Sequence, residues 1–222
     1  MKPKLITMLT YHDQTVSNAL EIFDQNKELP VECWGFKNIG LPVEEMKELV
    51  SAMKKAHKST FLEVVTYTED SCLAAAKLAL ECQFDYLMGT VYFESVHHLL
   101  KNHPLKYFPF CGKINGHPSI LEGSIEEIIE EAQKLEKKGV DGFDLLGYRY
   151  KPGDPEELII EFLRKIKIPT VLAGSIHSFE RLDKVKKFNP WGFTIGGAFF
   201  DQKFVQGGSF KDQIISVLSY LK

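Results

Sequence analysis

The sequence lacks the features that mark several specialised classes of protein. It has no apolar run approaching the ~18 residues that cross a membrane, and Met1–Lys4 leads straight into a strand-like run rather than an apolar signal segment. It also has no dense block of basic residues, since 27 Lys and Arg stand against 30 Asp and Glu, for a net charge of -3. We therefore expect no membrane partner and no nucleic-acid partner.

Cysteine is scarce as well. The 222 residues contain four cysteines, with no Cys-x-x-Cys pair and no spacing typical of a zinc site. Isolated cysteines suit a reducing compartment, where they pack as small apolar side chains. The sequence therefore predicts a cytoplasmic protein with no metal site, and no pattern in it calls for a cofactor.

No linker rich in Gly, Pro or Ser interrupts the chain, so we expect one domain over residues 1–222. Strand-like and helix-like runs alternate with a period of about 28 residues, which is typical of repeated strand–helix units. The eight expected strands are Leu5–Leu9, Val31–Trp34, Phe61–Val65, Tyr86–Met88, Phe108–Cys111, Phe143–Leu146, Thr170–Ala173 and Phe193–Ile195. Because helical crossovers join parallel strands, the pattern predicts an α/β fold, a (β/α)8 TIM barrel.

Local signals at two helix starts support this pattern. Ser124 with Glu127 forms a capping-box pattern, and Asp154 followed by Pro155 is typical of an N-cap and first helical position. The main alternative is a doubly wound open sheet, which usually carries a glycine fingerprint after its first strand. The sequence there is Thr10–Asp13, without glycine, which favours the barrel.

Barrel active sites lie at the C-terminal ends of the strands, and that rule selects the candidate residues. His12 follows the first strand and is a candidate acid or base, while the neighbouring Thr10 or Asp13 could equally cap the first helix. Glu32 and Glu63 lie within expected strands, where a carboxylate needs a partner. We consider proton transfer and an ion pair equally for Glu32, and favour an ion pair, with Lys37 or Lys113, for Glu63.

Lys113 lies in the densest polar segment of the chain, just after the fifth expected strand. A lysine in this position can stabilise an anionic intermediate or, if its pKa is lowered, form a Schiff base. Asp144 in the next strand is an obvious partner, and it favours the charged role. The catalytic candidates are therefore Lys113, Glu32, Asp144 and His12.

Two further residues are candidates for substrate binding. Arg149 could hold a carboxylate or phosphate, although most arginines lie on the surface. Thr90, after the fourth expected strand, could offer a hydroxyl to substrate or cap a helix.

Small residues follow both of the last two expected strands. Gly174 and Ser175 come after the seventh, and Gly196 and Gly197 after the eighth. Small residues let backbone N–H groups approach an anion, and these two loops often hold phosphate in barrels. We therefore expect a phosphorylated small molecule as ligand.

Together with Lys165–Pro169, the segments Thr170–Ile176 and Gly192–Ala198 resemble the C-terminal quarter of the ribulose-phosphate-binding barrel superfamily, over residues 165–200. That resemblance implies a phosphate held by the backbone at the four small residues named above. It does not extend to the catalytic motifs of individual families: no Asp-x-Lys-x-x-Asp follows the third strand, no paired His/Asp metal pattern is evident, and the sixth strand carries Asp144 rather than a Schiff-base lysine.

The expected function is a cytoplasmic enzyme that acts on a small phosphorylated sugar or related carbonyl compound, as a lyase or as an isomerase or epimerase. The alternative is a barrel that senses a phosphorylated metabolite without turnover, as in the glycerol-responsive antiterminator proteins that belong to the same superfamily. Association into a homo-oligomer is compatible with either function.

Overall fold

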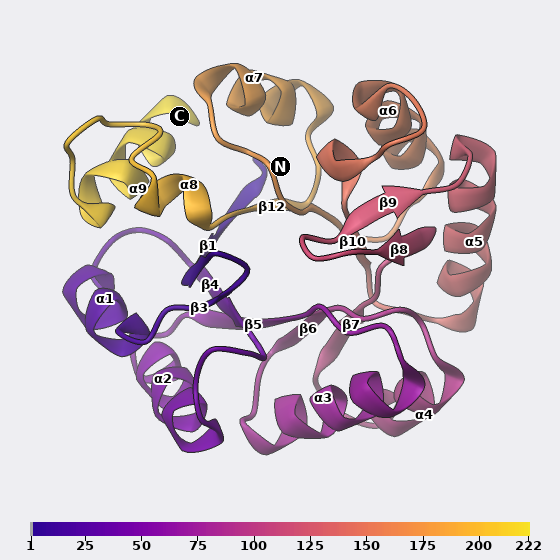
Figure 1. Ribbon diagram of the computed structural model, residues 1–222, viewed down its shortest axis with the longest axis horizontal. Coiled ribbons are helices and arrows are strands. Elements are labelled where there is room, and N and C mark those ends of the chain that lie inside the picture. The colour runs from indigo at the N-terminus through magenta and orange to yellow at the C-terminus, as the bar shows by residue number, and fades with distance from the viewer. Residues whose placement is uncertain (1) are drawn as a thin grey trace.

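The computed structural model describes residues 2–222 and shows a barrel of parallel strands inside a ring of helices (Figure 1). Eight strands form one sheet in the order β10-β11-β12-β1-β4-β5-β6-β7. They are β1 (Lys4–Met8), β4 (Cys33–Lys37), β5 (Ser59–Val64), β6 (Tyr86–Gly89), β7 (Lys106–Phe108), β10 (Phe143–Leu145), β11 (Thr170–Leu172) and β12 (Gly192–Ile195). This arrangement confirms the predicted (β/α)8-barrel fold.

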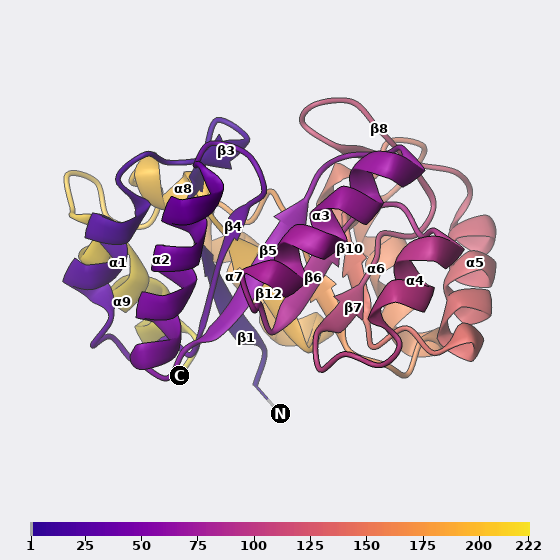
Figure 2. The ribbon, with the colours of Figure 1, turned by 90° about the horizontal axis from the view of Figure 1, so that it is seen from below.

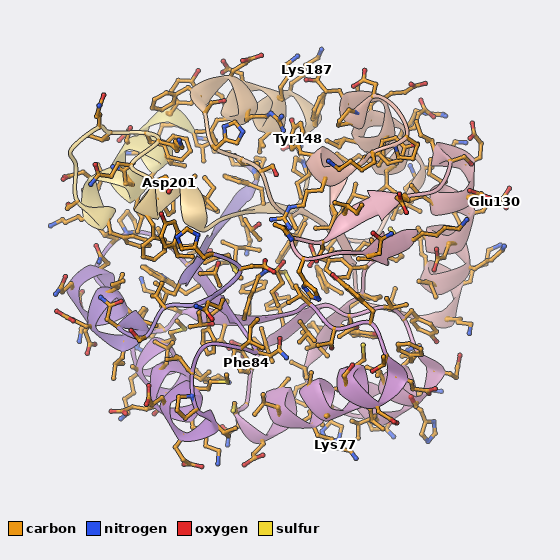
Figure 3. All side chains as sticks on the ribbon, viewed as in Figure 1. Lys77, Phe84, Glu130, Tyr148, Lys187 and Asp201 are labelled. Atoms are coloured by element: carbon orange, nitrogen blue, oxygen red, sulfur yellow. The ribbon has the colours of Figure 1, made fainter. Side chains whose placement is uncertain are left out.

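The helices surround this sheet and cover its outer face. They are α1 (Ala19–Asn26), α2 (Val43–Lys55), α3 (Glu69–Glu81), α4 (Glu94–Leu100), α5 (Ile125–Lys138), α6 (Pro155–Lys165), α7 (Phe179–Phe188), α8 (Gly197–Phe200), α9 (Phe210–Tyr220) and a short 3-10 helix, η1 (Gly147–Arg149). Their outward faces carry charged side chains such as Lys77, Glu130 and Lys187 (Figure 3). Among the helices in residues 2–222, none is long and apolar enough to cross a membrane.

Two short antiparallel hairpins stand apart from the barrel sheet. One pairs β2 (Thr10–Tyr11) with β3 (Gln14–Thr15), and the other pairs β8 (Lys113–Asn115) with β9 (Ile120–Glu122). Both lie at the end of the barrel away from the chain termini (Figure 2).

The barrel is nearly closed, and its seam lies between β7 and β10. These strands form no regular ladder, but the Asp141 N–H donates to the Tyr107 carbonyl and the Asp144 N–H to the Pro109 carbonyl, each at 3.1 Å. The Asp141 carboxylate also accepts hydrogen bonds from the Tyr107 N–H at 3.0 Å and from Lys106 Nζ at 2.9 Å. Asp141 thus holds the seam through its side chain as well as its backbone.

The interior of the barrel is apolar towards the N-terminal ends of the strands and charged towards their C-terminal ends. Its apolar part is a separate cluster of buried residues: Ile6, Met8, Cys33, Phe61, Met88, Phe108 and Val171, with Tyr86 and Trp191 packed against it. Phe61 and Tyr86 stack with ring centroids 4.2 Å apart. On β5, Glu63 lies two residues beyond Phe61 on the same inward face and pairs in register with Lys37 of β4.

The predicted helix starts are confirmed. Ser124 accepts a hydrogen bond from the Glu127 N–H, and the Glu127 side chain accepts one from the Ser124 N–H, which completes a capping box. Asp154 accepts from the Glu156 N–H at the start of α6, with Pro155 in the first turn. In both cases residues close in sequence satisfy the exposed N–H groups of the first turn, so the local pattern was sufficient.

The strands β4 and β7 differ most from their predicted bounds, by two or three residues at each end. β4 begins at Cys33 and runs to Lys37, so Gly35 lies inside it. A Cβ at Gly35 would lie 2.7 Å from Met8 Sδ and 2.9 Å from the Phe61 carbonyl oxygen, so only glycine lets the neighbouring strands pack here. β7 ends at Phe108 because Pro109 has no N–H with which to continue a ladder.

The seam generates a first prediction. Asp141→Ala removes the side-chain acceptor of a half-buried backbone N–H where no ladder compensates, and should lower the free energy of unfolding by about 1–3 kcal/mol in urea titrations. Asp183→Ala is the matched control, because Asp183 accepts one exposed hydrogen bond, from Tyr220, between helices. Equal effects of the two changes would show that the Asp141 side chain does not hold the seam.

Candidate functional site

A cavity of about 310 Å³ opens at the C-terminal ends of β1, β4, β5, β11 and β12. The two hairpins stand at this end of the molecule, opposite the chain termini (Figure 2). The lining residues come from four places: the end of β1 with the β2–β3 hairpin, the ends of β4 and β5, the end of β12 with the loops after β11 and β12, and Arg149 with the tip of the β8–β9 hairpin. This is the end at which barrel enzymes carry their active sites.

The β2–β3 turn places two polar residues over the cavity. His12 and Asp13 are its central residues, and both have positive φ, 47° and 65°. This is the backbone of the tight turns that suit the twist of a β-hairpin. The Asp13 carboxylate bonds to Lys37 Nζ and lies 3.8 Å from Nδ1 of His117, at the tip of the other hairpin. Asp13 therefore does not cap α1, which begins at Ala19.

Lys37 is the centre of a buried charged cluster. Only 4% of its surface is exposed, and its Nζ donates a hydrogen bond to Asp13 and lies 3.9 Å from Glu63 Oε2. An ammonium removed from water needs such carboxylate partners. The ion pair that the sequence suggested for Glu63 therefore forms with Lys37, and it forms inside the cavity.

Asp144 lies beneath this cluster. Its neighbours Phe143 and Leu145 belong to the outer, helix-facing core, and its register partner Val171 belongs to the interior cluster, so its side chain points into the barrel. Asp144 is 1% exposed, and within residues 2–222 neither carboxyl oxygen has a hydrogen-bond partner of ordinary geometry. Burial raises its pKa well above the usual range, Glu63 raises it further, and Lys37 and Arg149 oppose both effects.

The opposite wall of the cavity is made largely of backbone. The Gly174 N–H donates to Thr194 Oγ1 at 3.1 Å, which joins the loop after β11 to β12. Ser175 has a φ of 56°, which turns the chain sharply beside the cavity. Within residues 2–222, no hydrogen bond is formed by the N–H groups of Ser175, Gly196 and Gly197. Three backbone donors at the cavity wall are thus available to an anion.

The two glycines after β12 differ in the space around them. A Cβ at Gly196 would lie 2.6 Å from Thr10 Oγ1 and 3.2 Å from Met8 Cβ, so β1 packs directly against it. A Cβ at Gly197 would meet one neighbour, Tyr11 Cδ2, at 3.8 Å, which is ordinary van der Waals contact. A side chain can therefore be added at Gly197 without disturbing the fold.

Arg149 lies between the backbone wall and the β8–β9 hairpin. Its guanidinium packs against Gly174, where a Cβ would lie 2.7 Å from Arg149 Nε, and its Nη1 donates to the Ser119 carbonyl at 3.3 Å. Ser119 Oγ is in turn 2.6 Å from the Tyr67 hydroxyl. These contacts fix the Arg149 guanidinium at the cavity and attach the tip of the β8–β9 hairpin to it.

The structure brings most of the predicted site residues together. Six of the predicted residues line the cavity: His12, Arg149, Gly174, Ser175, Gly196 and Gly197. Asp144 lies buried below it. Three predicted residues lie elsewhere: Glu32, Lys113 and Thr90.

Glu32 was expected to lie with the other catalytic candidates, but the structure places it elsewhere. Glu32 precedes β4 and so lies at the N-terminal end of the barrel, with 80% of its side chain exposed and its carboxylate 3.8 Å from Lys4 Nζ. The error follows from the strand bounds, since the residue that reaches the C-terminal end of β4 is Lys37.

The predictions that Lys113 and Thr90 belong to the site are also wrong, each for a different structural reason. The chain leaves the barrel after Pro109, so Lys113 lies on the exposed hairpin strand β8, opposite Glu122, and not at the cavity. Thr90 is fully buried with a φ of 64°, and its hydroxyl is 3.0 Å from the Tyr107 hydroxyl in the outer core. It neither lines the cavity nor caps a helix.

Sequence reasoning missed Lys37 and Asp13 as members of the site. A signal for Lys37 was present, because it ends an inward-facing series with Cys33 and Gly35 at period two. Asp13 would have required recognition of a two-residue turn in Tyr11–Gln14. In the part of the chain that the structure describes, no three His, Cys, Asp or Glu side chains are grouped to hold a metal ion.

Comparisons with known proteins support the fold. No protein-family model and no curated protein matches the sequence. Among solved structures, an N-acetylmannosamine-6-phosphate 2-epimerase from Clostridium perfringens has a TM-score of 0.63 at 14% identity, over 100% of this chain and 94% of that chain. The orotidine 5'-phosphate decarboxylase from Pyrococcus horikoshii has a TM-score of 0.69 at 11% identity, over 98% of each chain.

This chain has the fold of these barrels. A glycerol uptake operon antiterminator-related protein from Thermotoga maritima also matches, with a TM-score of 0.55 at 14% identity, over 88% of this chain and 95% of that chain. At such identities the comparisons establish the architecture alone. The fold implied by the sequence resemblance is thereby confirmed.

The burial of Asp144 predicts a pH dependence of stability. In the unfolded chain an aspartate ionises above about pH 4, whereas the folded chain favours the protonated form because of its raised pKa. The folded state then binds more protons than the unfolded state, so the free energy of unfolding should fall as pH rises above about 4. Asp144→Asn cannot ionise and should show a shallower fall in urea titrations between pH 5 and pH 8.

Asp201→Asn is the control for this experiment, because Asp201 is exposed beside α8 (Figure 3). It should keep the wild-type slope. An unchanged slope in Asp144→Asn would mean that ionisation of Asp144 costs the folded state nothing.

Proposed function

We propose that the protein is an enzyme that acts on a small phosphorylated sugar or related carbonyl compound, as a lyase or as an isomerase or epimerase. The observation that carries the proposal is the division of one cavity into two parts. Unpaired backbone N–H groups line one wall, and a lysine with two carboxylates from different segments occupies the other. A substrate anchored by phosphate at the first wall would present its carbonyl carbons to the second.

The first wall supplies the proposed phosphate site. The N–H groups of Ser175, Gly196 and Gly197 would donate to phosphate oxygens, and Arg149 and Lys203 beside them would balance its charge. Neighbours of the same fold include an enzyme whose name specifies a sugar phosphate and another whose name specifies a nucleotide phosphate. These names support the proposed ligand class.

The second wall supplies the proposed chemistry. The Glu63 carboxylate would accept the proton from the carbon beside the carbonyl, and the bonding electrons would move onto the carbonyl oxygen as an enediolate. The Lys37 ammonium would stabilise that oxyanion. Return of the proton to the other carbon, or to the other face, would complete an isomerisation or epimerisation. Asp144 would hold a further proton beneath Glu63, and His12 at the rim would be a second proton carrier.

Lys37 thus takes the role that the sequence suggested for Lys113. Its ammonium donates a hydrogen bond to Asp13, an arrangement that suits an electrophile better than a Schiff-base nucleophile. Borohydride treatment in the presence of a carbonyl substrate should therefore leave no covalent adduct.

The alternative is a sensing barrel without turnover, which the antiterminator-related neighbour supports. A sensor needs the phosphate wall alone, whereas the buried Lys37 cluster is costly to maintain unless it has a use. That cost favours the enzyme. A cytoplasmic location is part of the same proposal, supported by four buried cysteines that form no disulfide in the described chain. Association into a homo-oligomer stays a prediction.

The phosphate wall can be tested with Gly197→Asp. The added side chain has room, and a carboxylate suits the first turn of a helix, so the melting temperature should not fall. Its charge should repel phosphate and weaken the binding of inorganic phosphate about tenfold or more in calorimetry. Gly197→Asn adds a side chain of equal size without the charge, so its affinity for inorganic phosphate should fall much less. Equal affinities in both variants and the wild type would place the anion site elsewhere.

Turnover can be tested by proton exchange. Dihydroxyacetone phosphate in D2O should take up deuterium beside its carbonyl faster with the wild-type protein than without it, as followed by NMR. Glu63→Gln should slow the exchange by about 10²–10⁴-fold. Lys113→Met should leave the rate unchanged, because Lys113 is exposed and does not line the cavity. Binding of the probe without exchange would refute the enzyme proposal and favour the sensor.

A further inference from the structure

The end of the cavity away from the phosphate wall carries more negative than positive charge. Asp13 and Glu63 face it, and Lys37 lies between them. The Lys37 ammonium is already bonded to the Asp13 carboxylate, with His117 close to the same group. Of these two carboxylates, Glu63 is therefore the one whose charge is less compensated.

Glu63 also has unused capacity to accept hydrogen bonds. Within residues 2–222 its carboxylate accepts no hydrogen bond, and its approach to Lys37 Nζ, at 3.9 Å, is too long for one. Its side chain is 12% exposed, and that exposed part faces the cavity. A mostly buried carboxylate without hydrogen bonds favours a ligand that brings O–H donors and disfavours one that brings negative charge.

The walls of the cavity restrict the ligand further. Its volume of about 310 Å³ is at the small end of ligand pockets. No Phe, Tyr or Trp is among its lining residues in the described chain, and its aromatic groups are the two smaller imidazoles of His12 and His177. The cavity suits a short sugar monophosphate better than a nucleotide.

We infer that the ligand is a phosphomonoester of a short, uncharged polyhydroxy chain, and that Glu63 determines this specificity by accepting hydrogen bonds from its hydroxyl groups and repelling carboxylates. This inference rests on the proposed phosphate site and adds the chemistry of the part of the ligand that would lie against Glu63. Phosphorylated keto acids and other carboxylated sugar phosphates are then poor ligands.

A matched pair of probes tests it. Glycerol 3-phosphate and 3-phosphoglycerate share their carbon chain and phosphate, and differ in having an alcohol or a carboxylate at the far end. Calorimetry at pH 8 should show about tenfold or more tighter binding of glycerol 3-phosphate. In Glu63→Gln the ratio should shrink to about threefold or less, because the amide accepts hydrogen bonds without repelling the carboxylate.

Asp201→Asn is the matched control variant. Asp201 also lines the cavity but follows α8, near the phosphate wall, where it accepts a hydrogen bond from the Tyr11 hydroxyl. Neutralising it should strengthen the binding of both probes by a similar factor and leave their ratio unchanged. Circular dichroism and the affinity for inorganic phosphate would show that Glu63→Gln remains folded with an intact phosphate wall.

The outcomes separate the inference from the proposed function. If inorganic phosphate and both probes fail to bind the wild-type protein, the phosphate site is wrong and the inference falls with it. If the probes bind equally, or the carboxylated one binds more tightly, the phosphate site stands and the inference is overturned. An unchanged ratio in Glu63→Gln also overturns it, because selectivity would then come from another residue.

Discussion

The need to compensate a buried lysine governs the functional end of this barrel. Lys37 reaches the C-terminal end of β4 with almost no exposure, and an ammonium in that position is stable only beside carboxylates. Glu63 on the adjacent strand supplies one and Asp13 from the β2–β3 turn supplies the other. The turn therefore folds inward over the barrel, and the same turn brings His12 to the rim of the cavity.

The charged side chains inside the barrel lie at its C-terminal end, because aromatic side chains fill the rest of the interior. Phe61, Tyr86 and Phe108 fill the barrel interior towards its N-terminal end with aromatic contacts. Asp144 sits at the boundary between these rings and the charged cluster. Its raised pKa is the electrostatic result of that position, since water cannot solvate its charge and Glu63 opposes it.

Much of this architecture was predictable from sequence, and the failures have local causes. The alternation of strands and helices, the caps at Ser124 and Asp154, and the small residues after the last two strands depend on neighbours in sequence, so patterns identified them. The prediction for Lys113 was wrong because Pro109 ends β7 and the chain then leaves the barrel as a hairpin. No periodicity in the sequence indicates that turn. Lys37 was missed because Gly35 suits the interior of β4 for a reason of tertiary packing, its contact with Met8 and Phe61.

Gly196 packs against Met8 and Thr10, and so joins the first strand of the barrel and the hairpin after it to the loop after the last strand. One wall of the cavity therefore belongs to the beginning of the chain and the other to its final quarter. During synthesis, a ribosome-bound chain that has already formed β1 and its hairpin still lacks every backbone donor of the proposed anion site. Ligand can then assist only the last stage of folding, when the segment from Gly174 to Lys203 has emerged and docked against β1.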